Sequence, residues 1–101
     1  MAVRDIKIAE IPSFIEIIGA NAFELCRRLQ KVEFQNESKI KIIKKYAFSE
    51  SSIREIVIPK SVTKICEEAF SECEFLRKVE IHKNSELVEI EESAFAIASI
   101  E

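Results

Sequence analysis

The feature that most constrains this chain is an internal duplication. When the sequence is shifted by 47 positions, the block 6–54 aligns with the block 53–101 without a gap. Seventeen of the 49 aligned pairs are identical, including Pro12 with Pro59 and Cys26 with Cys73. Unrelated segments would share only a few identities, so the chain is built from copies of one unit, and a repeating architecture is indicated.

Each block divides again into two smaller units. An Ala-Phe pair occurs four times, at Ala22-Phe23, Ala47-Phe48, Ala69-Phe70 and Ala94-Phe95. Runs with apolar residues at their first, fourth and sixth positions begin at Ile6, Leu29, Ile53 and Leu76, which are 23, 24 and 23 residues apart. The chain therefore contains four repeats of two alternating subtypes, at about 6–28, 29–52, 53–75 and 76–99, and Ile100 opens a fifth run.

The two subtypes differ in how the apolar run ends. In the first subtype the run leads into Pro12 or Pro59, and in the second into a longer polar turn, QNESK or HKNSE. Proline cannot donate a hydrogen bond to a sheet, so it belongs where a strand ends. The alternation of Val32 and Phe34 around Glu33 predicts a strand with one buried face. The segment CEEAFSEC predicts one or two helical turns, with acidic residues near the start.

A repeat of this size cannot bury its own isoleucine, valine and phenylalanine side chains, whereas stacked repeats form a continuous core. We therefore predict an α/β solenoid with parallel strands on a concave face and short helical segments on the convex face. The four phenylalanines of the Ala-Phe pairs are expected to form successive rungs of one spine.

The pattern L-x-x-I-x-I-P-x-S-V-x-x-I-x-x-x-A-F-x-x-C, nearly verbatim from Ile53 to Cys73, resembles the BspA-like subclass of leucine-rich repeats. The resemblance covers almost the whole chain. It implies a leucine-rich repeat solenoid and a surface protein that binds host or matrix proteins. The usual glycine after the isoleucine survives only as Gly19. The usual cysteine is replaced by Ser51 and Ala98 in the second subtype, so that position requires a small residue rather than sulfur chemistry.

The outward strand positions form charged columns, an acidic one beside a basic one. The predicted protein-binding face consists of Lys7, Glu10, Lys31, Glu33, Arg54, Glu55, Arg77, Lys78 and Glu80. One interpretation is a charge-patterned docking surface, which makes the chain a non-catalytic protein–protein interaction module. The other is that opposite charges only keep the sheet soluble, which makes it a structural spacer without a ligand of its own. Four strands about 20 Å long and about 4.8 Å apart offer about 400 Å², less than the roughly 800 Å² per partner of a standard interface. Weak binding is therefore predicted.

The sequence argues against catalysis, cofactors and metals. The single histidine, His82, and the single aspartate, Asp5, lie in different repeats, and the single glycine excludes a glycine-rich phosphate loop. Cys26 and Cys73 are two repeats apart, about 10 Å, beyond the roughly 7 Å limit for a disulfide. The three cysteines are therefore predicted to be reduced packing residues, and zinc lacks ligands.

Composition excludes further partners. The formal charge is −3, and the one basic cluster, Lys41, Lys44 and Lys45, lacks interleaved aromatic residues, so no nucleic-acid binding is expected. Charged residues interrupt every apolar run before the roughly 18 residues of a membrane span, and no secretory signal is visible. The compartment stays open; the family resemblance points to the cell surface, with an adhesive role, within a longer exported chain.

The two ends of the array carry a further expectation. The last full unit ends in AFAIASIE, and the chain stops inside the next strand. Since solenoids normally close with a polar capping repeat, we expect a single domain that is a fragment of a longer array. The alternative is end-to-end self-association through uncapped repeats.

Overall fold

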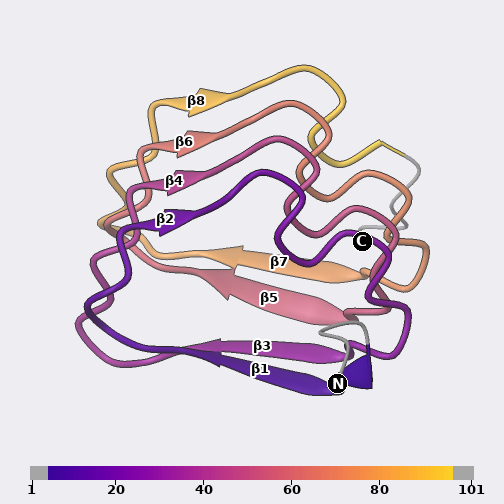
Figure 1. The fold of residues 1–101 in the computed structure, drawn as a ribbon. Coiled ribbons are helices and arrows are strands. Elements are labelled where there is room, and N and C mark those ends of the chain that lie inside the picture. Colours follow the sequence, from indigo (N-terminus) through magenta and orange to yellow (C-terminus); the bar gives the residue numbers. More distant parts are fainter. Residues whose placement is uncertain (1–4, 97–101) are drawn as a thin grey trace.

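A computed structural model describes residues 5–96, which form four stacked coils (Figure 1). Each coil contributes one strand of four residues and one strand of two. The long strands are β1 (Ile8–Ile11), β3 (Lys31–Phe34), β5 (Glu55–Ile58) and β7 (Lys78–Ile81), and the short strands are β2 (Ile17–Ile18), β4 (Ile42–Ile43), β6 (Lys64–Ile65) and β8 (Glu89–Ile90). All pairings between these strands are parallel. The prediction of four stacked repeats with parallel strands is confirmed; the expected fifth run at Ile100 lies outside the described residues.

The predicted helical segments are wrong, because the part of the chain that the structure describes contains no α-helix. Each Ala-Phe pair lies instead in a turn between residues with left-handed backbone. Asn21 and Leu25, with φ of 63° and 62°, flank the first pair, and the equivalent residues are Tyr46, Glu50, Glu68, Glu72 and Ser93. A left-handed residue every fourth position breaks a right-handed helix. The molecule is therefore a β-solenoid rather than an α/β one.

Hydrogen bonds between coils replace the helical bonds at this corner. The Phe23, Phe48 and Phe70 amides donate to the carbonyls of Ala47, Ala69 and Ala94 of the next coil, each at 2.7 Å. A helix of about eight residues is too short to be stable alone, whereas these bonds form a ladder that runs through the stack. We call this edge of the solenoid the Phe corner.

The Phe corner contains the predicted spine. The rings of Phe23, Phe48, Phe70 and Phe95 are stacked with centroid separations of 5.2, 5.2 and 5.0 Å. Phe48 and Phe70 are fully buried, and the two terminal rings are partly exposed. The prediction of one continuous phenylalanine spine is confirmed.

The short strands form a second sheet that the sequence analysis did not predict. They pair in the order β2-β4-β6-β8, opposite the long strands (Figure 1). Their inward residues Ile18, Ile43 and Ile65 are buried, and the core lies between the two sheets and the Phe corner. Two-residue strands are too short to show an alternation, so no periodicity marks them.

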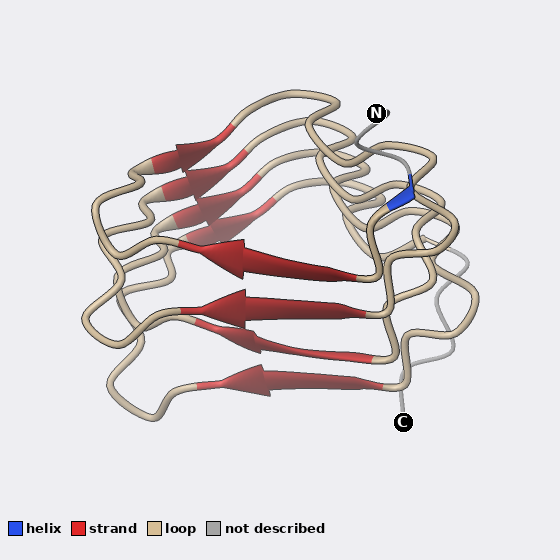
Figure 2. Ribbon diagram, turned by 60° about the horizontal axis from the view of Figure 1, so that its bottom comes forward, coloured by secondary structure: helices blue, strands red, loops and turns tan. Residues whose placement is uncertain are grey.

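The absence of helices from the described residues also removes the expected cause of curvature. Helices are about 10 Å wide and would spread one side of the stack, but the rings here repeat at 5.0–5.2 Å, close to the roughly 4.8 Å between strands. We therefore use the term long-strand face, rather than concave face, for the outward residues of β1, β3, β5 and β7 and the residue before each strand. Figure 2 shows this face toward the reader.

The long strands do not form one sheet. β1 pairs with β3, and β5 pairs with β7, but no ladder joins β3 to β5, although the short strands of the same coils are joined. At the end of the first pair, the Gln35 amide donates to the Ile11 carbonyl at 3.1 Å. The equivalent residue after β5 is Pro59, which has no N–H to offer to Phe34. The proline of the first subtype therefore accounts for one lost bond at this boundary.

A side chain links the second and third coils beside this break. The Ser61 hydroxyl, which is buried, lies 3.0 Å from the Ser38 carbonyl and 2.6 Å from the Ile40 carbonyl. The two halves of the molecule are thus held by this serine, the Phe corner and the short-strand sheet, and not by the long strands.

Candidate functional site

All nine residues of the predicted binding face are exposed. Six lie within long strands, namely Glu10, Lys31, Glu33, Glu55, Lys78 and Glu80, whereas Lys7, Arg54 and Arg77 directly precede β1, β5 and β7. The backbone of these preceding residues is fixed, since the Arg77 amide donates to the Arg54 carbonyl at 2.8 Å. The predicted residues therefore lie within the long strands or directly before them.

The charges on this face compensate one another only in part. Lys31 and Glu33 of β3 form an ion pair of 3.5 Å, and Glu55 is the direct neighbour of Lys78. Glu10, however, is the direct neighbour of Glu33, and like charges at such positions repel.

Four cations of the face lie outside the ion pairs. Among residues 5–96, Lys7, Arg54, Arg77 and Lys78 take part in no ion pair. Mutual neutralisation therefore accounts for Lys31 and Glu33 of β3, but it does not explain the basic residues that precede the strands.

A groove with a volume of about 580 Å³ lies where β3 and β5 are not paired. Its apolar lining residues are Val32, Phe34, Val57 and Pro59; its polar lining residues are Lys31, Glu33, Gln35, Asn36, Glu37, Ser38, Lys60 and His82. Val57 interrupts the acidic column and is 55% exposed. The sequence analysis missed this groove, although valine in a charged column and proline at the strand end were its two signals.

The only histidine lies at the end of this groove in an ordinary turn. His82 is exposed, and its Nδ1 accepts a hydrogen bond of 2.9 Å from the Asn84 amide. This contact orders the turn that follows β7. Among residues 5–96, no acid or nucleophile is paired with the imidazole in its described hydrogen bonds.

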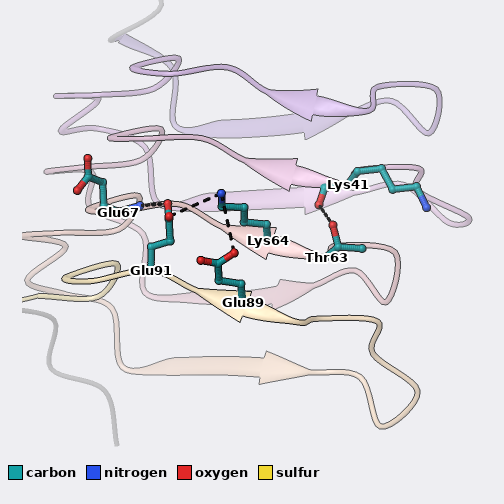
Figure 3. Close-up of polar contacts among 6 residues, drawn as sticks. All are labelled: Lys41, Thr63, Lys64, Glu67, Glu89 and Glu91. Atoms are coloured by element: carbon teal, nitrogen blue, oxygen red, sulfur yellow. Dashed lines mark hydrogen bonds and ion pairs between the residues drawn. The ribbon is translucent and has the colours of Figure 1, made fainter.

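On the short-strand side, Lys45 and Lys64 form ion pairs, whereas Lys41 and Lys44 take part in none among residues 5–96. Lys64 lies between Glu89 and Glu91, at 3.9 and 3.6 Å, and a Glu91 carboxylate oxygen accepts a bond from the Glu67 amide at 3.2 Å (Figure 3). The predicted basic cluster extends into this region, where Lys45 pairs with Glu67 at 3.4 Å. These contacts cross between neighbouring coils and support the stack.

The backbone on this side is also linked by a side chain. The Thr63 hydroxyl donates to the Lys41 carbonyl at 3.2 Å (Figure 3). This bond joins the second and third coils on the short-strand side.

The cysteines have structural roles. None of the three is in a disulfide, and Cys26 and Cys73 are buried. The Cys73 thiol donates to the Phe48 carbonyl at 3.1 Å, and Ser51, which occupies the same column, lies 3.5 Å from its sulfur. Burial raises the pKa of the thiols of Cys73 and Cys66, and this keeps them in the unreactive form. Ala98 of this column lies outside the described residues.

Within residues 5–96, no three or more His, Cys, Asp or Glu side chains are grouped so that they could hold a metal ion. The same range contains no helix with the length and apolarity of a membrane span.

The chain is similar to a known repeat family and to several solved structures. The family model of the BspA type leucine-rich repeat region matches residues 2–101. No curated protein matches the chain. The solved structure of the leucine-rich repeat protein TpLRR from T. pallidum is 30% identical, with a TM-score of 0.82, and the match covers 93% of this chain and 43% of that one.

Two further solved structures show the same fold at lower identity. The pneumococcal vaccine antigen PcpA is 20% identical, with a TM-score of 0.77, over 93% of this chain and 29% of its own. A leucine-rich cell surface protein of Faecalibacterium prausnitzii is 21% identical, with a TM-score of 0.50, over 94% of this chain and 39% of its own. The chain thus spans less than half the length of each of these three proteins.

Proposed function

The chain belongs to the BspA-type leucine-rich repeat family, and on that premise we propose that it is a protein-recognition module that binds through its long-strand face. Repeats of this family are typically non-catalytic, in agreement with the expectation that the chain is not an enzyme. The ligand class is a protein, and no cofactor is involved.

The observation that carries this proposal is the groove on the long-strand face, which is partly lined by apolar residues. Four cations of the same face, Lys7, Arg54, Arg77 and Lys78, take part in no ion pair among residues 5–96. Side chains that do not satisfy one another are available to a ligand.

A place at the cell surface is the second part of the proposal. PcpA is a vaccine antigen and the Faecalibacterium prausnitzii protein is a cell surface protein. By analogy, this chain acts within a larger surface protein, where an adhesive role suits a repeat face. The small area of the face supports weak binding by the isolated chain, which longer arrays or several copies would strengthen.

A structural spacer is the competing function, and the Lys31–Glu33 ion pair and the position of Glu55 opposite Lys78 favour it. The two functions are distinguished by selecting binders from a displayed library of extracellular protein domains. The bait is the wild-type chain, the double variant Arg54→Glu/Arg77→Glu, or the control Lys41→Glu/Lys44→Glu on the short-strand side.

A recognition module enriches domains that bind the wild type and the control but bind the Arg54→Glu/Arg77→Glu variant at least about tenfold more weakly, a loss of about 1.4 kcal/mol. A spacer enriches none. Domains that are lost only with the Lys41→Glu/Lys44→Glu control would move the binding face to the other sheet and contradict the proposal.

A further inference from the structure

The groove between β3 and β5 is a place where two strands of one face lie side by side without a ladder. In parallel strands, the N–H and C=O of one residue point to the same neighbouring strand, and successive residues alternate. Since the Gln35 amide points to β1, the backbone groups of Phe34 and Val32 point toward β5. By the same register, those of Val57 point toward β3.

These backbone groups are the kind that an extended peptide recognises. A peptide added to a sheet edge gains affinity from main-chain hydrogen bonds and specificity from pockets for alternate side chains. Here the edge groups border a cavity of about 580 Å³, within the range of about 300 to 1,000 Å³ of ligand sites. Val57, which is 55% exposed, and the partly buried Phe34 and Pro59 offer the apolar contact for one large apolar side chain, whereas the Val32 side chain lies in the core.

Charge defines the second feature of the ligand. Arg54 and Arg77 directly precede β5 and β7 and take part in no ion pair among residues 5–96. Arg54 lies three residues before Val57, about 10 Å along an extended chain. A carboxylate about three residues from the apolar side chain of an extended ligand can therefore reach these guanidinium groups.

We infer that the groove between β3 and β5 binds an extended peptide segment of a protein ligand, with one large apolar side chain between Phe34, Val57 and Pro59 and an acidic residue near Arg54 and Arg77. This inference rests on the proposed function and assigns its specificity. Pro59 has the central role, because it leaves position 59 without the N–H that would help to close β5 onto β3.

The test uses two short peptides of threonine residues whose termini are blocked. Each contains one leucine and one glutamate about three residues apart, and the glutamate precedes the leucine in one peptide and follows it in the other. Nuclear magnetic resonance titration of the labelled chain is expected to shift the Val32, Phe34 and Val57 amides. The variant Pro59→Ala restores an N–H, closes the groove, and lowers the affinity about tenfold or more. The matched control Pro12→Ala, at the equivalent position of the first coil, binds as the wild type does.

A second variant keeps the test decisive if Pro59→Ala alters the fold. Val57→Asp changes an exposed residue and places a charge in the groove, so it abolishes binding while the amide spectrum elsewhere stays unchanged. Replacing the leucine of the peptide by alanine, or methylating the peptide backbone nitrogens, has the same effect.

The inference is overturned if neither peptide shifts these amides at millimolar concentration, or if Pro59→Ala and Val57→Asp both bind as the wild type does. Shifts confined to Arg54, Arg77 and the outward strand residues would reject the groove and leave the proposed long-strand face intact. Failure of the proposed function itself is read separately, from the domain selection with the Arg54→Glu/Arg77→Glu variant.

Discussion

Single residues decide how the coils of this solenoid meet. Pro59 has no N–H to donate to the second coil, and close to it the Ser61 hydroxyl donates to the Ile40 carbonyl of that coil. Ser51 takes the place of cysteine beside Cys73. The substitution of Cys by Ser was predicted to require only a small residue, and the buried Ser51 agrees with that. The partner of Ser61 was not predictable, because the repeat pattern gives the equivalent position in each coil but not which carbonyl of the neighbouring coil faces it.

Tyr46 shows the same kind of contact between coils in a form that can be titrated. Its hydroxyl donates to a carboxylate oxygen of Glu68 at 2.7 Å, and the Lys45 ammonium lies 5.3 Å from its ring. The hydrogen bond to Glu68, together with the negative charge of that residue, raises the pKa of Tyr46. The chain contains one tyrosine and no tryptophan, so the ultraviolet absorbance of the phenolate reports this group alone.

We predict that Glu68→Gln lowers the pKa of Tyr46 toward the usual value of about 10. A raised folded-state pKa stabilises the fold below pH of about 10, and this contribution is lost as the pH rises through the folded-state pKa. The wild type therefore loses stability above that pH more steeply than Tyr46→Phe does. Spectrophotometric titration and denaturation at several pH values measure both effects.

The control for this prediction is Glu86→Gln, an exposed carboxylate that is not among the causes of the shift. It is expected to leave the titration unchanged. Equal midpoints for the wild type and Glu68→Gln would show that the contact with Glu68 does not persist in solution.

At the scale of elements, the long strands and the Phe spine were predictable and the corner turns were not. The strands carry an alternating apolar pattern, and the Ala-Phe pairs recur at a fixed place in every repeat, so their stacking follows from the period. Left-handed turns are usually marked by glycine or asparagine. Here Leu25, Tyr46 and Glu72 adopt φ of 62°, 58° and 55°. Residues of these types also occur in helices, so the sequence does not mark the turns.

This strain predicts a stabilising substitution at the Phe corner. Glu72 is exposed, has φ of 55°, and donates its amide to the Ala96 carbonyl at 2.7 Å. Glu72→Gly keeps that bond and removes the steric cost of the left-handed backbone, which is about 1–2 kcal/mol per residue. We expect the free energy of unfolding to rise by about 0.5–1 kcal/mol in urea denaturation, after the greater flexibility of glycine in the unfolded chain is allowed for.

Glu74→Gly is the matched control, since Glu74 is exposed on the same corner but is not among the left-handed residues. Without strain to relieve, glycine there only adds freedom to the unfolded chain and lowers the stability by up to about 1 kcal/mol. If the two variants change the stability equally, the left-handed corner is not a source of strain.

At the scale of the whole molecule, four coils resolve into two pairs on one side and a continuous stack on the other. The duplication of 47 residues predicted four repeats of two alternating subtypes, and the division of the long strands falls at the boundary between the two copies, although it was not predicted. The exposure of the nine face residues followed from the same pattern. The groove was not predictable in this way, because it depends on which of two neighbouring coils donates the backbone hydrogen bond at each boundary. The sequence repeat does not give the direction of that bond.

The pairing of coils predicts a pattern of amide hydrogen exchange. The Glu33 amide points to β1 within a ladder, and the amide of Val57, its equivalent one coil later, points into the groove. We therefore expect Val57 to exchange at least about tenfold faster than Glu33 and than Glu80, which pairs with β5. In Pro59→Ala the restored N–H brings β5 onto β3, so the Val57 amide slows toward the other two. Equal exchange of all three amides in the wild type would mean that the long strands form one unbroken sheet in solution, in which case the groove and its ligand would have to be abandoned together.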